Sequence, residues 1–525
     1  MLGLAGAGLF VAALDAYLVV TLLPAMITDV GLTIERFEQA TPILTGFLCG
    51  YVIAMPLLGA YSDVRGRAPV YALCVVVFAA GSVVTATAGS LPWLVAGRVL
   101  QGLGGGGLVP LTLALAADLY EDRARTLALG AVSGLQEAGS VFGPIYGATL
   151  ASAASAAGGW RFVFWLNVPL AAICAAGLLA ASRDHGNRAA PVDSKADGPA
   201  RTFDNRASDV APTFDNRASD VARTFDWKSA CLLGLGLGLL VVALYPDDPD
   251  HRATSGLFVP LGILSLLVLT LYGWRQLRAL EPLIPRQLLR SPRFAGVTAA
   301  NLLIGAALMV ALVDVPILGR LIFNLDQLAS GLLLTQFLVG VPVGAILGGV
   351  VAGRIGERVT AVLGTLLAAA AFLQMSTWPA TELAIRMGPF RSADIALAAC
   401  GLGFGIVIAP LAATVLQLTR AQHHGLASSL VVLARVMGML IGLSALTAFG
   451  LFRFRQILGT PHLTDPDVRA RIEHLGRLVA AAFLQEYREI FTIAAGMCIL
   501  AAVVIFATIR RDSSEPALTP SAPQR

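Results

Sequence analysis

Long apolar runs separated by short polar stretches restrict the possible folds of this chain more than any other feature. A helix needs about twenty apolar residues to cross a bilayer core roughly 30 Å thick. Hydrophobic residues make up 56% of the 525 residues and charged residues only 13%, against about 25% charged residues in an average soluble domain. A soluble globular fold is therefore excluded. A transmembrane β-barrel is excluded too, because barrel strands alternate apolar and polar residues, and the run 232–244 does not.

The apolar runs predict an all-α polytopic membrane protein with about fourteen spans. We expect these spans at residues 4–27, 42–62, 69–90, 93–118, 127–151, 162–182, 229–245, 257–274, 295–322, 328–352, 359–378, 393–418, 426–456 and 480–509. An even number of spans places both termini on one side, and the positive-inside rule assigns that side to the cytoplasm, because most loop arginines fall there. The external stretch Arg453 to Arg488 is also rich in arginine but is long enough to be translocated regardless of charge. The chain is thus predicted to lie in the cytoplasmic (inner) membrane.

Two six-helix bundles are predicted, one at 1–182 and one at 295–510, the last two helices of the second extending into the periplasm at about 450–488. Between the bundles we expect a disordered cytoplasmic linker at 183–228, two extra transmembrane helices at 229–274 and a cytoplasmic connector at 275–294, and at the end a cytoplasmic tail at 511–525. The linker is polar and repeats the segment 202–211 from Thr213 onward, which is typical of disordered sequence. The repeat could also be a docking motif.

Glycine patterns in the two predicted bundles echo each other in the same order. Gly102-Leu-Gly104 is echoed by Gly401-Leu-Gly403, and Gly139-x-x-x-Gly143 by Gly438-x-x-x-Gly442. Each pattern alone is explained by close packing of helices, because lipid supplies no hydrophobic drive between them. Their shared order indicates that the two bundles are parallel repeats.

The sequence carries no pattern typical of an enzyme, a metal site or a cofactor site. The net charge of +4 is spread over loops, which indicates orientation in the membrane and not binding to nucleic acid. The six cysteines lie singly in apolar runs, without metal-ligand spacing. Gly104 to Gly107 lies within a predicted span and lacks the lysine that follows a phosphate-binding loop. We therefore expect no enzymatic activity, no metal and no cofactor.

A charged turn follows the second predicted span, at Gly59-Ala-Tyr-Ser-Asp63-Val-Arg65-Gly66-Arg67. Its glycines permit a tight turn, and Asp63 at a helix end can pair with the arginines. This turn resembles a signature motif of the major facilitator superfamily, in its fourteen-helix drug:proton antiporter branch. The other segments that carry the resemblance are Leu14-Asp15, Gly97-Arg98-Val-Leu-Gln101-Gly102, Gly139-Ser-Val-Phe-Gly143-Pro144-Ile-Tyr-Gly147 and Trp160 to Pro169.

The resemblance is specific over residues 1–170 and weaker beyond them. It implies the major facilitator fold, with two six-helix bundles, two extra helices and alternating access between the bundles. It also implies cytoplasmic gating by Gly59, Asp63, Arg65, Gly66 and Arg67, and helix packing by Gly139, Gly143, Pro144 and Gly147. In the second half, Gly353 stands where the first copy of the charged turn has Asp63, which weakens a gating role there.

A closer resemblance links the chain to the mycobacterial triacylglyceride exporters. The similar segments are Ala13-Leu-Asp15-Ala-Tyr17-Leu-Val-Val, Ala54-Met-Pro56-Leu-Leu-Gly59 and Gln136-Glu137-Ala-Gly139-Ser-Val. The resemblance implies a lipid substrate and a periplasmic lipid-carrying lipoprotein as partner. We expect the transporter itself to be a monomer.

Charged residues at membrane depth are the next candidates, because each costs roughly 2.5 to 3.5 kcal/mol at a helix centre. Asp15 is a candidate for proton coupling together with Arg98, and the alternative is a permanent pair or a kink cap. Glu137 and Arg435 are candidates for an ion pair that closes the cytoplasmic path between the bundles, and the alternative is that each finds a partner within its own half. Asp314 is interpreted as a solvated helix end.

The last two helices are predicted to continue beyond membrane length on the outer side. At 1.5 Å per residue, the second arm from Asp465 to Arg510 would measure roughly 65 Å. The projection carries an apolar stripe among arginines, which includes Phe452, Phe454, Ile457, Ile472 and Leu475. The stripe indicates a path for lipid, and the alternative is a self-packed hairpin. A shorter external hairpin is predicted to turn at Met387-Gly388-Pro389.

These observations predict a proton-coupled secondary transporter that exports triacylglyceride-like lipids across the inner membrane by alternating access. The alternative is a multidrug:proton antiporter, because amphipathic drugs suit the same apolar cavity. His423 and His424, at a cytoplasmic helix end, are interpreted as too exposed for catalysis.

Overall fold

The computed structural model describes residues 1–31, 41–153, 159–188, 225–244, 256–279, 282–325, 327–387, 390–458 and 468–509. The first six long helices are α1 (Leu2–Asp29), α2 (Thr41–Arg65), α3 (Arg67–Ala86), α4 (Leu91–Leu119), α5 (Asp122–Ala153) and α6 (Trp160–Arg188). Next come α7 (Trp227–Leu244), α8 (Phe258–Arg278) and the short α9 (Arg286–Leu289). The second half holds α10 (Pro292–Leu321), the short α11 (Gln327–Leu332), α12 (Thr335–Ile355), α13 (Glu357–Met375), α14 (Ser392–Gln417), α15 (His424–Leu458) and α16 (Val468–Thr508).

The all-α polytopic class is confirmed. Thirteen helical stretches within the described ranges are long and apolar enough to cross a membrane by length and composition. Helix α5 is not among these stretches although it has 32 residues, because it begins with a charged turn and carries Glu137 near its middle. Each predicted span nevertheless corresponds to one long helix.

Helix ends differ from the predicted bounds in places. Helix α6 continues to Arg188, beyond the predicted end at 182. The predicted linker falls mostly on 189–224, including its repeat, and that segment lies outside the described residues. The hairpin predicted at Met387-Gly388-Pro389 is confirmed: strands β1 (Arg386–Met387) and β2 (Phe390–Arg391) pair antiparallel. Short 3-10 helices, η3 (Glu382–Ala384) and η4 (Ala421–His423), precede β1 and α15.

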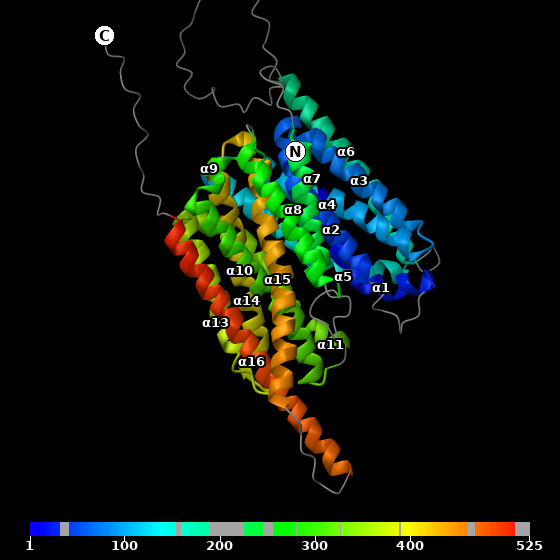
Figure 1. Cartoon of the computed structure of the whole chain (residues 1–525), viewed down its shortest axis with the longest axis vertical. Coiled ribbons are helices and arrows are strands. Elements are labelled where there is room, and N and C mark those ends of the chain that lie inside the picture. The colour runs from blue at the N-terminus through cyan, green and yellow to red at the C-terminus, as the bar shows by residue number, and fades with distance from the viewer. Residues whose placement is uncertain are drawn as a thin grey trace, which may run out of the picture.

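The two bundles lie side by side in Figure 1, α1 to α6 in blue to cyan and α10 to α16 in green to red. They meet where α2 and α4 pack against α15, and where α5 packs against α12 and α14. The end of the bundles that holds Asp63 is called the Asp63 end below. At the opposite end α15 stops and α16 begins, and the first part of α16 projects beyond the other helices (Figure 1).

Equivalent glycines make equivalent contacts in the two bundles. A Cβ on Gly102 of α4 would collide with the carbonyl oxygen of Phe47 in α2, and one on Gly401 of α14 would collide with that of Phe337 in α12. In the same way Gly139 of α5 approaches α1, and Gly438 of α15 approaches α10. These contacts are the ones that a parallel repeat of two bundles requires.

The extra helices α7 and α8 pack at the seam between the bundles. Helix α7 contacts both sides: Cys49 of α2 lies 3.9 Å from the carbonyl oxygen of Gly238, and Ser444 of α15 donates a 2.5 Å hydrogen bond to that of Leu244. Helix α8 packs on α7, where the hydroxyl of Ser265 donates to the carbonyl oxygen of Gly236 at 2.7 Å. Most of α8 remains exposed and apolar, as expected for a helix that faces lipid.

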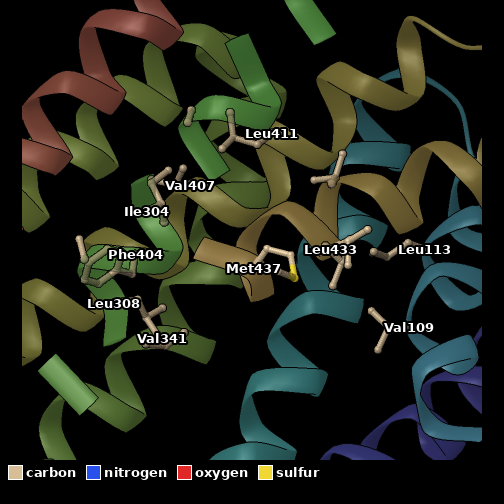
Figure 2. Close-up of a cluster of buried hydrophobic side chains, with 14 of the residues drawn as sticks. Val109, Leu113, Ile304, Leu308, Val341, Phe404, Val407, Leu411, Leu433 and Met437 are labelled. Carbon is tan, nitrogen blue, oxygen red and sulfur yellow. The ribbon is translucent and has the colours of Figure 1, made fainter. Parts of the chain in front are cut away.

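The apolar core is continuous across the two bundles. Figure 2 shows Val109 and Leu113 of α4 beside Leu433 and Met437 of α15, with side chains of α10, α12 and α14 around them. All of these side chains belong to one buried cluster. The halves are therefore packed against each other here, and the polar groups described next are set into that packing.

Candidate functional site

Asp15 lies in α1 and is completely buried. Its Oδ2 accepts a hydrogen bond from Nη1 of Arg98 at 2.7 Å, within an ion pair. Its Oδ1 accepts from Nε2 of Gln101 at 3.2 Å and from Nδ2 of Asn167 at 2.6 Å. The donors come from α4 and α6, so three helices of the first bundle converge on one carboxylate.

A second layer of polar contacts holds the partners of Asp15. Gln101 donates to the hydroxyl of Ser82 at 2.8 Å and accepts from Arg98 at 2.9 Å and from Thr85 at 3.2 Å. The guanidinium of Arg98 lies 4.4 Å from the ring centroid of Phe47. Its Nε and Nη2 have no hydrogen-bond partner among the described residues. Among the described residues Asp15 is the only counter-charge of this buried guanidinium, and leaving a buried charge unpaired is costly.

The structure thus brings Asp15 and Arg98 together, as proton coupling and a permanent pair both require. Asn167 was not assigned a role from the sequence. Its signal was its place in the segment Trp160 to Pro169, which opens α6 and carries part of the family resemblance.

Glu137 of α5 and Arg435 of α15 form an ion pair between the bundles. Nη2 of Arg435 lies 3.3 Å from Oε1 of Glu137, and the two side chains are 9% and 19% exposed, respectively. Tyr17 of α1 and Tyr51 of α2 lie within electrostatic range of both charges. The partner of each charge is therefore in the other half, and not in its own.

Asp63 joins the two bundles at the Asp63 end. Its two carboxylate oxygens each accept a 2.9 Å hydrogen bond, one from the backbone N–H of Gly425 and one from that of Leu426, in the first turn of α15. A helix N-terminus favours an anion at this position. Asp63 also pairs with Arg67. A Cβ on Gly59 would lie 2.5 Å from the carbonyl oxygen of Gly425, so the glycine is what allows α2 and α15 to approach.

Arg67 extends this connection. Its Nε lies 3.0 Å from Oδ2 of Asp118 at the end of α4, and its Nη2 donates to the carbonyl oxygen of Ala421 at 3.2 Å. Arg65 and Gly66 are exposed, and Gly66 has a φ of +91°, which the turn between α2 and α3 requires. We call Asp63, Arg67, Asp118 and the first turn of α15 the clasp.

His424 belongs to the clasp, contrary to the interpretation from the sequence. It is 4% exposed, and its Nδ1 lies 2.7 Å from Oδ1 of Asp118. Its place next to Gly425 suggested an exposed helix end, but the close approach of α2 and α4 covers it. Asp118 was likewise missed, because a single acidic residue at a helix end gives no sign of a partner in the other half.

The second seam, between α5 and α12, has no corresponding acid at Gly353. A Cβ on Gly353 would lie 3.6 Å from Cβ of Arg123, an ordinary contact distance. Glycines bring the helices together here: a Cβ on Gly130 or on Gly349 would lie 2.8 Å from a carbonyl oxygen of the opposite helix. The first seam therefore combines charges with a close backbone contact at Gly59, and the second shows close backbone packing at Gly130 and Gly349.

The glycines of the predicted helix-packing motif lie along α5 where it meets α1. A Cβ on Gly139, Gly143 or Gly147 would lie 2.8, 2.6 or 3.1 Å, respectively, from a carbonyl oxygen of α1. The side chain of Pro144 lies outside the described part of the structure.

The predicted outer stripe is described only in part. Phe452 is 65% exposed, whereas Phe454 stacks on Phe483 of α16 with ring centroids 4.3 Å apart. Ile457 is half-buried, and the side chains of Ile472 and Leu475 lie outside the described residues. The described stripe thus has one ring packed within the hairpin and one ring open to its surroundings.

Comparison with known proteins shows which family has this architecture. The family model described as Major Facilitator Superfamily matches residues 5–443. This chain belongs to the Major Facilitator Superfamily. A triacylglyceride transporter of Mycolicibacterium hassiacum is 37% identical, with 97% of this chain and 92% of that protein covered. A triacylglyceride transporter of Mycobacterium tuberculosis (strain H37Rv) is 36% identical, with 94% and 91% covered.

Solved structures of the Major Facilitator Superfamily share the fold. The human organic anion transporter MFSD10 (TETRAN) aligns with a TM-score of 0.57 at 18% identity, covering 96% of this chain and 98% of that one. The proton:xylose symporter XylE aligns with a TM-score of 0.58 at 14% identity, covering 96% and 94%. At these identities the likeness concerns the fold alone. Family and relatives together indicate a multi-pass membrane transporter rather than an enzyme.

Proposed function

We propose that this chain is a proton-coupled secondary transporter that exports triacylglyceride-like lipids across the inner membrane by alternating access. The observation that carries the lipid substrate is the similarity at 36–38% identity, over nearly the whole chain, to relatives named triacylglyceride transporters. The projecting start of α16 and the exposed ring of Phe452 support it (Figure 1). An apolar surface outside the bilayer suits a lipid that leaves the membrane.

Alternating access requires a closed end that can open. Here the Asp63 end is held by the clasp and by the pair of Glu137 with Arg435. Both consist of ionic and hydrogen-bonded contacts that water can replace, so their loss need not expose a large apolar surface. We propose that these contacts form the cytoplasmic gate, with both termini in the cytoplasm.

Proton coupling is assigned to Asp15 with Arg98. A proton that moves through 100 mV provides about 2.3 kcal/mol, which is enough to bias a conformational equilibrium of modest size. Protonation of Asp15 would break its ion pair with Arg98 and loosen the junction of α1, α4 and α6. The same step would couple the charge state of Asp15 to the position of α1, which packs on α5 beside Glu137.

We further propose that the monomer delivers lipid to a periplasmic lipid-carrying lipoprotein at the projection of α15 and α16. A multidrug:proton antiporter is the second candidate, because the motifs of residues 1–170 resemble that branch of the family. The two functions differ in substrate and not in mechanism, so a substrate assay separates them.

The test uses purified full-length protein in proteoliposomes with an imposed proton gradient. We expect transfer of labelled triacylglyceride to acceptor vesicles in the intact protein and its loss in Asp15→Asn. Asp29→Asn is the matched control, because Asp29 lies on the same helix but pairs with Arg161 at the helix end. Retention of lipid transfer in Asp15→Asn would refute the coupling role. Expulsion of a cationic dye without lipid transfer would instead support the multidrug:proton antiporter.

A further inference from the structure

Two carboxylates in the second bundle lack the partners that other membrane carboxylates have. Asp314 of α10 and Glu486 of α16 lie within electrostatic range of each other, on helices that pack together. Asp314 lies in the last third of α10, and Glu486 lies near the middle of α16. Asp314 is partly buried, and Glu486 is only 7% exposed. Because Asp314 is only partly buried, its interpretation as a solvated helix end stays a prediction.

Neither carboxylate has a hydrogen-bond donor or a cation as partner among the described residues. Oε2 of Glu486 is buried without a hydrogen bond. By contrast, Asp15 has three donors and Glu137 is paired with Arg435. Among the described residues, Oε1 of Glu382, in the short helix η3, is also buried without a hydrogen bond, but Glu486 is the one of the two that lies on a membrane-spanning helix.

The charged and titratable groups around the pair do not neutralise it. Tyr487 of α16 lies within electrostatic range of both carboxylates. Glu489, one turn further along α16, acts on Glu486. Glu489 is itself bound through both oxygens to Arg453 of α15, at 2.6 and 2.8 Å, so that arginine is already engaged.

Glu486 lies against α15. A Cβ on Gly450 of α15 would collide with Oε1 of Glu486, so the carboxylate rests against bare backbone of the neighbouring helix. Any other residue at position 450 would displace it. The glycine therefore provides the space that the carboxyl group occupies between α15 and α16.

A buried carboxyl group without a partner is costly to ionise, and two adjacent carboxyl groups resist ionising together. We propose that Asp314 and Glu486 form a second proton-binding site, which holds at least one exchangeable proton at neutral pH. The proton comes from the aqueous phase, binds one carboxylate oxygen and leaves from the same oxygen. The role of this site in transport rests on the proposed proton coupling: it would carry a proton in the outer part of the second bundle.

The test is infrared spectroscopy of the purified full-length protein in lipid nanodiscs. We expect a protonated-carboxyl absorption near neutral pH that shifts in heavy water, disappears on alkaline titration, and is lost in the double variant Asp314→Asn/Glu486→Gln. Asp29→Asn is the control, because Asp29 is paired with Arg161 in the first bundle, and this variant should keep the absorption. Absence of the absorption in the intact protein, or its persistence in the double variant, would overturn the proposal.

Transport measurements keep this inference distinct from the proposed function. If the absorption behaves as expected but transport by the intact protein ignores the proton gradient, the site stands and proton coupling fails. If transport follows the gradient while the double variant keeps both the absorption and the pH dependence of transport, coupling stands and the second site fails.

Discussion

The ion pair between Glu137 and Arg435 makes a quantitative prediction about the closed state of the Asp63 end. Replacing either residue by glutamine should raise the open population, because the pair joins α5 of one bundle to α15 of the other. The exchange Glu137→Arg/Arg435→Glu should return much of the closed population, since it restores opposite charges at the same two positions.

The magnitude follows from the geometry. For charges 3.3 Å apart, Coulomb's law gives about 5 kcal/mol at an effective dielectric constant of about 20. The side chains retain 9% and 19% of their exposure, so solvent screens the pair and the glutamine variants keep part of their polar contact. We therefore expect a coupling free energy of about 2 kcal/mol. This corresponds to roughly a 30-fold change in the open population.

The assay is labelling of Ser429→Cys by a water-soluble maleimide, in a background without the native cysteines. Ser429 is completely buried on α15, and its Cβ lies 3.0 Å from the position that a Cβ on Gly59 would take. Its labelling rate therefore reports opening of the seam between α2 and α15. Exchange of charges in the pair of Arg453 with Glu489, within the second bundle, is the control and should leave labelling unchanged. The reasoning is refuted if the single variants label at the rate of the parent, or if their effects add with a coupling below about 0.5 kcal/mol.

Three further predictions concern the clasp, the packing and the projection. Asp63→Asn should raise the labelling rate of Ser429→Cys by several-fold. The loss of charge removes the ion pair with Arg67 and weakens the interaction with the N-terminus of α15, which is worth about 1 kcal/mol. An unchanged labelling rate would argue against a gate at this position. Gly401→Ala should lower thermal stability by about 1 to 3 kcal/mol through overpacking, whereas Gly262→Ala, with open space around it, should not; equal melting temperatures would contradict the packing argument. Phe452→Ser should change the free energy of unfolding by no more than about 0.5 kcal/mol, because its ring is exposed. The same substitution should reduce the rate of lipid transfer to acceptor vesicles. An unchanged transfer rate would show that Phe452 is not part of the lipid path.

The fold could be predicted because a membrane span is a local property of sequence. Every predicted span corresponds to a helix, and the glycine echoes marked equivalent helices in the two halves. The contact between Glu137 and Arg435 was also open to prediction, since both charges are costly at membrane depth and lie on equivalent helices of the repeat. Helix ends were less accessible: α6 runs to Arg188 through polar residues that carry no membrane signal.

Polar contacts between the halves were the part that the sequence concealed. His424 and Asp118 are unremarkable at helix ends until α4 and α15 are placed together, where they lie 2.7 Å apart. Glu486 was missed because it follows the arginine-rich stretch that opens α16 and reads as part of a solvated projection. Only the packing of α10, α15 and α16 shows that its carboxylate is buried without a partner.

The two seams at the Asp63 end differ in a way that restricts how the gate can open. Between α2 and α15 the clasp is made of charges and helix-terminal N–H groups, which water can satisfy after separation. Between α5 and α12, Gly130 and Gly349 bring backbone against backbone, as Gly59 and Gly425 do between α2 and α15. Separation of α5 from α12 forfeits close packing over the whole contact. Opening between α2 and α15 must therefore break the clasp as well as the contact of Gly59 with Gly425, whereas opening between α5 and α12 must break the close packing at Gly130 and Gly349.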